Sequence, residues 1–399
     1  MLKTISKIAI SSIVAYSTLQ ADVSISTDNT GDFLIAPVYL TTKDVCSHIR
    51  VLNTNEYSSI LAKVTIREQI ASHEVDLPIF LSPGDVWEGK ICQCNGKATL
   101  YSNDDSNHPS ALDVLARGME LEKHSIVTQY RENDYNSGIV ELNGKQFKLQ
   151  ELQKTNVNFN KGYIEVYPIA QFDEGSKDKI NKKKLVHRWD RLIDSEIPDK
   201  KIRKNGVDEN SLTGSISFQT SQQETSAMKM VAFKNTHSKQ ILGDAINYTS
   251  DSSPDILLDK GVKKAIWNLL KKDKVSFFYD NRGEDQYIYF AYPFSYRELQ
   301  KRTFKLMIRD KCENKYTMVF SPKFIMKNEL ACISVANLIK LTHNINKFQT
   351  GMIQIKDITN STGVQLGRGK IASSIPTITR IKTMGQKDIV INAMPIASH

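Results

Sequence analysis

The sequence has no apolar run of the length that crosses a bilayer, which is about 18 or more residues. The most apolar stretch near the N-terminus, residues 8–16, is short and is interrupted by Ser11 and Ser12. No later segment reaches the required length. We therefore predict no transmembrane helix.

Sequence patterns typical of enzymes are also absent. The eight histidines are scattered, and none forms His-x-His, His-x-x-x-His or His-Glu-x-x-His, the spacings that place two imidazoles on one side of a strand or helix. There is no Gly-x-Ser-x-Gly elbow, no Gly-x-Gly-x-x-Gly loop, no Cys-x-x-Cys-His and no internal repeat. The sequence thus predicts no catalytic residues, no metal and no cofactor, and we expect a protein that is not an enzyme.

The first 21 residues have the layout of a secretory signal peptide. Lys3 and Lys7 form a basic start, residues 8–16 form a short apolar region, and a small residue, Ala21, ends the segment. We predict cleavage after Ala21 and export through the Sec pathway to the periplasm, the outer surface or the extracellular space. A retained membrane anchor is the alternative, but it needs a longer apolar run.

Export would make the five cysteines candidates for disulfides, because thiols outside the cytoplasm tend to be oxidised. Cys312 and Cys332 lie 20 residues apart in strand-like segments and are the first expected bridge. Cys46 can pair with only one of Cys92 and Cys94, and we predict Cys46–Cys94 as the possible second bridge. The odd number leaves at least one cysteine unpaired within the chain. A metal site at these cysteines is an alternative that lacks a fourth ligand.

Residues 31–102 read as a succession of short strands that are rich in β-branched and aromatic residues. A short helix is predicted from Ser110 to Gly118, and further strands follow, among them 331–339. This spacing predicts a mainly β chain with an Ig-like or other β-sandwich architecture in one or two sandwich units. The expected organisation is a signal peptide at 1–21, an N-terminal β-sandwich at 22–172, a basic helical insertion at 173–210 and a C-terminal β-rich region at 211–399 with a basic helix near 256–273.

Two lysine-rich segments interrupt the β pattern. Residues 176–207 hold 11 Lys or Arg against 5 Asp or Glu, and residues 260–274 hold six Lys against one Asp. Apolar positions in each fall on one helical face, so we predict two basic amphipathic helices inserted at sheet edges. When the predicted signal peptide and these two segments are left out, the remaining residues carry a net charge of −4. The formal charge of +9 is therefore local and does not indicate nucleic-acid binding.

Lysine-coated helices can dock on anionic membranes or polymers, although such a face is more often simply solvated. Contact with a polyanion or lipopolysaccharide would use Lys182, Lys183, Lys184, Arg188, Lys200, Lys201, Arg203, Lys204, Lys260, Lys264 and Lys271.

Carboxylates offer a further possibility, because a glycosidase pair converges in space and not in sequence. A secreted carbohydrate-active hydrolase is therefore the alternative function. The loops 102–107 and 280–285 hold enough oxygen ligands for calcium, but neither matches the EF-hand pattern. Ordinary turns are the simpler interpretation of both.

The N-terminal third carries a set of short motifs. They are Gly-Asp-Phe-Leu-Ile-Ala-Pro-Val-Tyr at 31–39, Val-Leu-Asn-Thr at 51–54, Ala-Lys-Val-Thr-Ile-Arg-Glu at 62–68, Glu-Val at 74–75 and Leu-Ser-Pro-Gly-Asp-Val-Trp at 81–87. This set resembles a family of exported bacterial proteins of unknown function. The resemblance implies a β-sandwich protein of the cell surface or envelope, and it supplies no catalytic residues.

The expected function is therefore an exported, non-enzymatic protein of the cell envelope or surface with a structural, adhesive or assembly role. Its expected partners are envelope or surface components, anionic polymers such as lipopolysaccharide, and other copies of the chain. Polyanion binding through the lysine-rich segments is the second alternative, beside the hydrolase.

Overall fold

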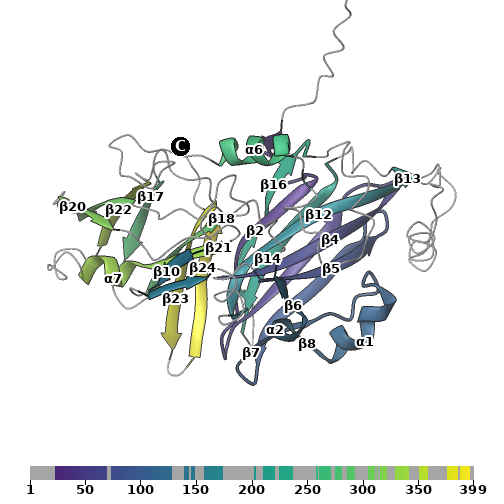
Figure 1. Ribbon diagram of the computed structural model, residues 1–399, viewed down its shortest axis with the longest axis horizontal. Coiled ribbons are helices and arrows are strands. Elements are labelled where there is room, and N and C mark those ends of the chain that lie inside the picture. Colours follow the sequence, from purple (N-terminus) through teal and green to yellow (C-terminus); the bar gives the residue numbers. More distant parts are fainter. Residues whose placement is uncertain are drawn as a thin grey trace, which may run out of the picture.

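A computed structural model of the chain shows a mainly β protein (Figure 1). The predicted signal peptide lies outside the residues that the structure describes, as does nearly all of the basic segment 176–207. The described residues are 23–69, 73–127, 139–142, 145–148, 157–173, 202–203, 210–220, 224–236, 258, 260–270, 275–280, 285–292, 304–310, 312, 315–320, 329–340, 350–357, 375–384 and 387–395.

The larger of two packed sheets, which we call sheet A, has eight antiparallel strands in the order β1-β16-β2-β12-β4-β5-β9, with β13 paired to β12. Its strands are β1 (Ser24–Ile25), β2 (Phe33–Leu40), β4 (Ser58–Glu68), β5 (His73–Leu81), β9 (Ile126–Val127), β12 (Lys161–Asp173), β13 (Ile202–Arg203) and β16 (Val231–Lys234).

Sheet B has six antiparallel strands in the order β15-β14-β3-β6-β7-β8 and packs against sheet A. Two short helices, α1 (Pro109–Arg117) and α2 (Leu121–His124), follow β7, and α1 confirms the helix predicted there. The strands are β3 (Cys46–Asn53), β6 (Val86–Cys94), β7 (Lys97–Tyr101), β8 (Met119–Glu120), β14 (Leu212–Gln219) and β15 (Glu224–Lys229).

The core between the sheets follows from the alternation of side chains along each strand. In β3, Ile49 and Val51 are fully buried, while the alternate residues His48, Arg50 and Leu52 are partly exposed. Trp87 of β6 is fully buried in the same core. Apolar residues at every second position thus direct one face of sheet B toward sheet A, as the sequence predicts for a sandwich.

Strands from 212–234 complete both sheets, so the sandwich takes in residues beyond the expected limit of 172. The predicted strand at 229–233 is two strands: β15 ends at Lys229 in sheet B and β16 begins at Val231 in sheet A. Met230 lies at the crossing, where its main-chain nitrogen donates to the Gly214 carbonyl at 2.9 Å.

The C-terminal part forms two further antiparallel sheets beside the sandwich (Figure 1). One sheet has the order β17-β22-β19-β20 and the other β21-β18-β23-β24. The strands are β17 (Val275–Asp280), β18 (Asp285–Tyr292), β19 (Phe304–Asp310), β20 (Lys315–Phe320), β21 (Glu329–Ser334), β22 (Thr350–Asp357), β23 (Ile375–Met384) and β24 (Lys387–Pro395).

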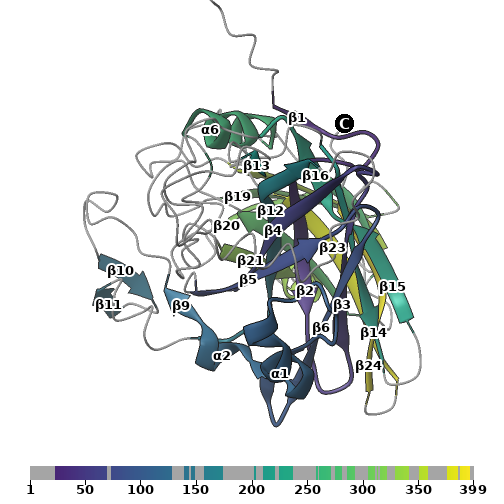
Figure 2. The same cartoon turned by 90° about the vertical axis from the view of Figure 1, so that its right-hand side faces the viewer.

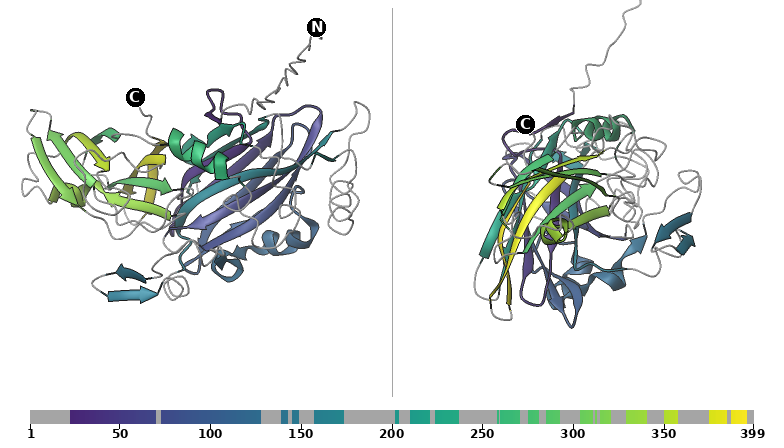
Figure 3. Two further views of the ribbon diagram at one scale, coloured as in Figure 1. Left: turned by 45° about the horizontal axis from the view of Figure 1, so that its top comes forward. Right: turned by 90° about the vertical axis from the view of Figure 1, so that its left-hand side faces the viewer.

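These sheets share contacts with the sandwich. Tyr289 and Ala291 of β18 belong to the same buried core, and β18 contacts β2. Strand β24 lies alongside β15 at the edge of sheet B (Figure 2). A separate hairpin of β10 (Ile139–Leu142) and β11 (Lys145–Lys148) extends away from the sheets (Figure 3).

Two helices lie in the C-terminal half of the described chain. Helix α6 (Lys260–Leu269) confirms the prediction of a helix near 256–273, and its Val262 and Ile266 are buried against the core. The predicted strand at 331–339 is wrong in its second half, because β21 ends at Ser334 and helix α7 (Val335–Lys340) follows. The buried Val335, Leu338 and Ile339 have helical spacing, which a short apolar run does not distinguish from a strand.

Close packing in sheet A predicts the effect of adding one methyl group. A Cβ at Gly162 would lie 1.7 Å from the Arg67 carbonyl oxygen, whereas a Cβ at Gly96, in the β6–β7 turn, would meet nothing within 4 Å. Gly96 has a φ of +79°, so alanine there is strained without a clash. We expect Gly162→Ala to lower the free energy of unfolding by about 3 kcal/mol or more and Gly96→Ala by about 1–2 kcal/mol. Urea unfolding of both variants measures the difference, and equal losses would contradict the packing described here.

Candidate functional site

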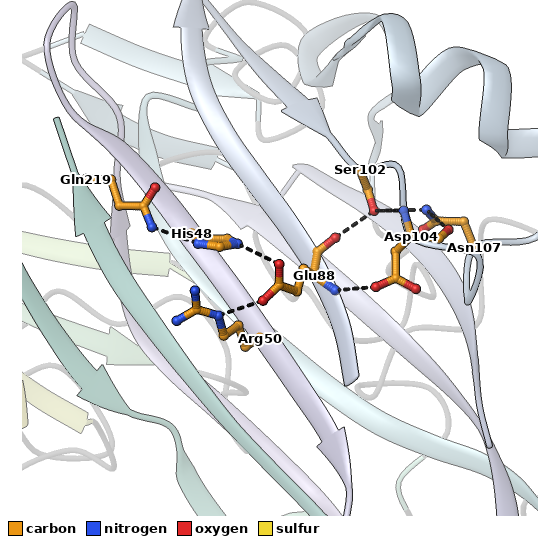
Figure 4. Close-up of polar contacts among 7 residues, drawn as sticks. All are labelled: His48, Arg50, Glu88, Ser102, Asp104, Asn107 and Gln219. Atoms are coloured by element: carbon orange, nitrogen blue, oxygen red, sulfur yellow. Dashed lines mark hydrogen bonds and ion pairs between the residues drawn. The ribbon is translucent and has the colours of Figure 1, made fainter. Parts of the chain in front are cut away.

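The outer face of sheet B carries a cluster of polar side chains from three strands (Figure 4). His48 and Arg50 come from β3, Glu88 from β6 and Gln219 from β14. Alternation along the strands places these side chains on the face opposite the core, and the register pairs Arg50 directly with Glu88. We call these four residues the Glu88 cluster.

Glu88 lies between an arginine and a histidine. Nε of Arg50 donates to Oε1 of Glu88 at 2.8 Å, and Nε2 of His48 lies 3.6 Å from Oε2. The Gln219 amide nitrogen donates to Nδ1 of His48 at 2.8 Å, so this tautomer carries its proton on Nε2, which faces Glu88. The side chains of Glu88 and Arg50 are 48% and 42% exposed, so solvent and solutes reach the pair.

Arg50 sets the electrostatics of this cluster. Its hydrogen bond lowers the pKa of Glu88 below the usual range, and the nearby His48 acts in the same direction, while partial burial opposes both. Glu88 therefore stays ionised to a lower pH than a solvated glutamate. The arrangement offers a carboxylate, a guanidinium and an amide on one face of the sheet, a set that can bind polar groups by hydrogen bonds.

The main chain of Glu88 is fixed by the loop that follows β7 (Figure 4). Its nitrogen donates to Oδ2 of Asp104 at 3.0 Å, and its carbonyl accepts from Oγ of Ser102 at 2.6 Å. Asn107 donates to the same Ser102 oxygen at 2.9 Å and accepts from Nε1 of the buried Trp87 at 2.8 Å. The loop therefore joins the exposed cluster to the core.

In the first candidate calcium loop, 102–107, the side chains of Ser102 and Asp104 thus form hydrogen bonds with main-chain groups. Oδ1 of Asp104 accepts from the Ser106 nitrogen at 2.8 Å. In the second loop, Asp280 ends β17 and Asp285 begins β18, and the residues between them lie outside the described ones. Among the residues that the structure describes, no group of three or more His, Cys, Asp or Glu could hold a metal ion.

A second set of charges lies in sheet A and is completely buried. Arg67 of β4 forms an ion pair with Glu74 of β5 through Nη1 and with Glu165 of β12 through Nε, the latter at 2.8 Å. All three side chains have 0% exposure. Since Arg67 lies directly across from Glu74 in the register, one cation connects three adjacent strands. We call these residues the Arg67 cluster.

A buried acid and base lie beside the Arg67 cluster on the same strands. Oγ1 of Thr65 donates to Oδ1 of Asp76 at 2.6 Å, and Nζ of Lys63 lies 3.8 Å from Oδ2. Burial raises the pKa of Asp76, and the charge of Lys63 opposes that rise. Sheet A thus holds carboxylates inside the protein next to matched cations.

Sequence reasoning missed this buried charge. Alternating charged and apolar residues in β4 are typical of a strand with one wet face. However, all 11 residues of β4 are buried. A signal was present in the motifs at 62–68 and 74–75, whose charged positions include Arg67 and Glu74.

A disulfide joins Cys46 to Cys92, with a Cα–Cα distance of 4.4 Å. The β3–β6 register pairs Ser47 with Ile91, so the next residues outward, Cys46 and Cys92, face each other. The predicted alternative Cys46–Cys94 is therefore wrong, and Cys94 is an exposed free thiol.

The predicted bridge between Cys312 and Cys332 is also wrong. Cys312 is an exposed free thiol in the turn between β19 and β20. Cys332 lies in β21, where it pairs with Tyr289 of β18. The two cysteines therefore belong to different sheets, although the sequence between them is short.

The structure describes three of the predicted polyanion-binding residues, and two of them, Lys260 and Lys264, lie one turn apart on helix α6. Lys264 is exposed on α6, Lys260 is the first residue of that helix, and Arg203 lies in β13. The remaining predicted residues lie outside the described ranges; they are Lys182, Lys183, Lys184, Arg188, Lys200, Lys201, Lys204 and Lys271.

Comparison of the chain with models of known families, with curated proteins and with solved structures gave no match. Within the described ranges, no helix has the length and apolar character needed to span a membrane. The Cys46–Cys92 disulfide weakly indicates an oxidising setting outside the cytoplasm.

Arg67 is expected to be worth far more to stability than the exposed Arg50. Arg67→Ala leaves two carboxylates buried without their cation, so we expect a loss of about 3–5 kcal/mol in the free energy of unfolding. Arg50→Ala removes a half-exposed pair and should cost about 0.2–1 kcal/mol. Adding Glu74→Gln and Glu165→Gln to Arg67→Ala should recover part of the loss, because the uncompensated charge is then gone. Denaturant unfolding checks all three, and a loss below 1 kcal/mol for Arg67→Ala would contradict the buried assignment.

Glu88 should titrate below the usual range for glutamate, and Arg50→Ala should move its pKa upward. A lowered folded-state pKa means that this group stabilises the fold above the unfolded-state pKa. That stabilisation is lost as the pH falls through the folded-state value. Carbon NMR of the Glu88 carboxyl measures both titrations, with Lys123→Ala in helix α2, where Lys123 pairs with Glu120, as the control. An unchanged Glu88 pKa in Arg50→Ala would disprove the role given to Arg50.

Proposed function

We propose that this chain is an exported, non-enzymatic protein of the bacterial cell envelope or surface, with a structural, adhesive or assembly role. The signal-peptide pattern and the resemblance of the N-terminal motifs support export. The disulfide between two central strands supports it weakly. The Ig-like character of the sandwich stays a prediction.

The observation that carries the non-enzymatic proposal is the burial of the Arg67 cluster. The hydrolase alternative requires two carboxylates that converge and that a substrate can reach. Glu74 and Glu165 do converge, on Arg67, but both have 0% exposure. The exposed carboxylate of Glu88 is held by Arg50, whose hydrogen bond lowers the pKa of this carboxyl group, whereas a general acid needs a raised pKa.

One end of the sandwich has the properties of a contact surface. Tyr57 is 68% exposed there, at the tip of the β3–β4 loop. Asn55 holds this loop by accepting from the Tyr57 and Ser58 nitrogens at 2.7 and 2.8 Å, and its carbonyl accepts from Gly84 in the neighbouring β5–β6 turn. An exposed tyrosine on a loop held by hydrogen bonds supports an adhesive or assembly role, because aromatic residues often dominate protein interfaces.

Processing and location test the proposal. In bacterial cells we expect the full chain to lose its first 21 residues and to fractionate outside the cytoplasm. Mass spectrometry of the mature N-terminus and separation of cell compartments measure this, and Ile10→Asp with Val14→Asp, which charges the apolar region, should block both. An unprocessed cytoplasmic protein would contradict export. Size-exclusion chromatography of the exported protein and of its Tyr57→Ala variant reports whether assemblies form through the β3–β4 loop.

Polyanion binding is a second candidate, favoured by helix α6. The helix buries Val262 and Ile266 and turns Lys264 to solvent, which is the arrangement of a surface helix with a basic outer side.

Heparin chromatography tests this second candidate. The wild type should be retained and should elute earlier as salt rises. Reversal of Lys182, Lys183, Lys184 and Lys264 to Glu should abolish retention. The control reverses four other lysines, Lys43, Lys97, Lys123 and Lys229, which are exposed elsewhere. Equal retention of the two variants would eliminate a specific role for the lysine-rich segments.

A further inference from the structure

Three cysteines lie on the outer face of sheet B at the same end. Cys46 begins β3, and Cys92 and Cys94 are at the end of β6. Cys46 and Cys92 form the disulfide, and Cys94 is an exposed free thiol. A disulfide and a free thiol are therefore neighbours in one small region.

Strand geometry places the free thiol within reach of the bond. Residues two apart on a strand share a face and lie about 6–7 Å apart, so Cys94 is on the same face as Cys92. Cys46 and Cys94 are diagonal neighbours across the strand pair, for which the Cα atoms are about 7–8 Å apart. A disulfide between them needs about 6.8 Å or less, so an approach of about 1 Å is enough.

The backbone at Cys94 is less constrained than the middle of the sheet. The β3–β6 register ends at the pair Ser47–Ile91, so β3 does not hold β6 at Cys94. Among the described strands, only β7 pairs there, through Lys97, next to the two-residue turn Asn95-Gly96. A strand end beside a hairpin turn adjusts more easily than the middle of a sheet.

We propose that Cys46, Cys92 and Cys94 form a thiol–disulfide exchange site in which Cys94 is the internal nucleophile. The Cys94 thiolate attacks Sγ of Cys46, a Cys46–Cys94 bond forms, and the Cys46–Cys92 bond breaks. The electron pair leaves on Cys92, which takes up a proton. One disulfide and one thiol are present before and after, so the step needs no oxidant or reductant.

The exchange changes which thiol the protein presents. Cys94 is exposed, whereas Cys92 is half-buried. The Cys46–Cys92 isomer therefore offers its thiol to disulfides in the surroundings, and the Cys46–Cys94 isomer withdraws it. The site would react with external disulfides, of proteins or of small thiols, through Cys94. This inference does not depend on the proposed function.

Peptide mapping of the purified full chain tests the exchange. The protein is incubated without oxygen at pH 8.5, quenched with acid, alkylated at low pH and digested without reduction. We expect a Cys46–Cys94 peptide and alkylated Cys92 to appear beside the main Cys46–Cys92 peptide, faster as the pH rises because the thiolate attacks. The rate should not depend on protein concentration, since the step is within one chain.

Two variants decide the role of Cys94. Cys94→Ser should lose Cys92 alkylation completely while it keeps the Cys46–Cys92 bond. Cys92→Ser should form the Cys46–Cys94 bond in a glutathione redox buffer. If Cys92→Ser does not fold, the comparison of the wild type with Cys94→Ser still decides. The proposal would be overturned if Cys92 is alkylated no more in the folded wild type than in Cys94→Ser.

Discussion

The ion pairs of Arg67 are the interaction on which sheet A depends. One guanidinium connects β4 to β5 through Glu74 and to β12 through Glu165, in the middle of the largest sheet. The apolar face of the same strands packs on sheet B, so both faces of β4 are buried. Buried charges are costly unless they are paired. The pairing therefore sets the alignment of three strands, and the core formed by their other face relies on that alignment.

A second constraint joins sheet B to its exposed face. Trp87 fills the core and donates to the side chain of Asn107, which donates in turn to Oγ of Ser102. The Ser102 hydroxyl then donates to the Glu88 carbonyl oxygen at 2.6 Å. The core, the loop after β7 and the Glu88 cluster are thus one hydrogen-bonded unit. The polar groups of the candidate calcium loop 102–107 serve this unit, and the cluster that they support is partly exposed to solvent.

Local features of the sequence predicted local structure well. Short runs of β-branched and aromatic residues predict β2 to β7, the segment from Ser110 to Gly118 predicts α1 to within one residue at each end, and helical spacing predicts α6. Long-range features were not predictable in the same way. The return of β14 and β16 to opposite sheets, the choice of Cys92 over Cys94 and the separation of Cys312 from Cys332 all depend on register and strand order. The candidate site was missed for the same reason, since Arg50, Glu88 and Gln219 are distant in sequence and meet only through pairing.

The position of β24 beside β15 has a consequence for the behaviour of the protein in solution. Each of these strands is the last of its sheet, and such strands expose main-chain groups that can recruit other chains. Here two open edges lie against each other, as Figure 2 shows for the described strands. The C-terminal sheets therefore shield the sandwich from uncontrolled strand pairing at that edge. Loss of the last strands would expose it and favour aggregation.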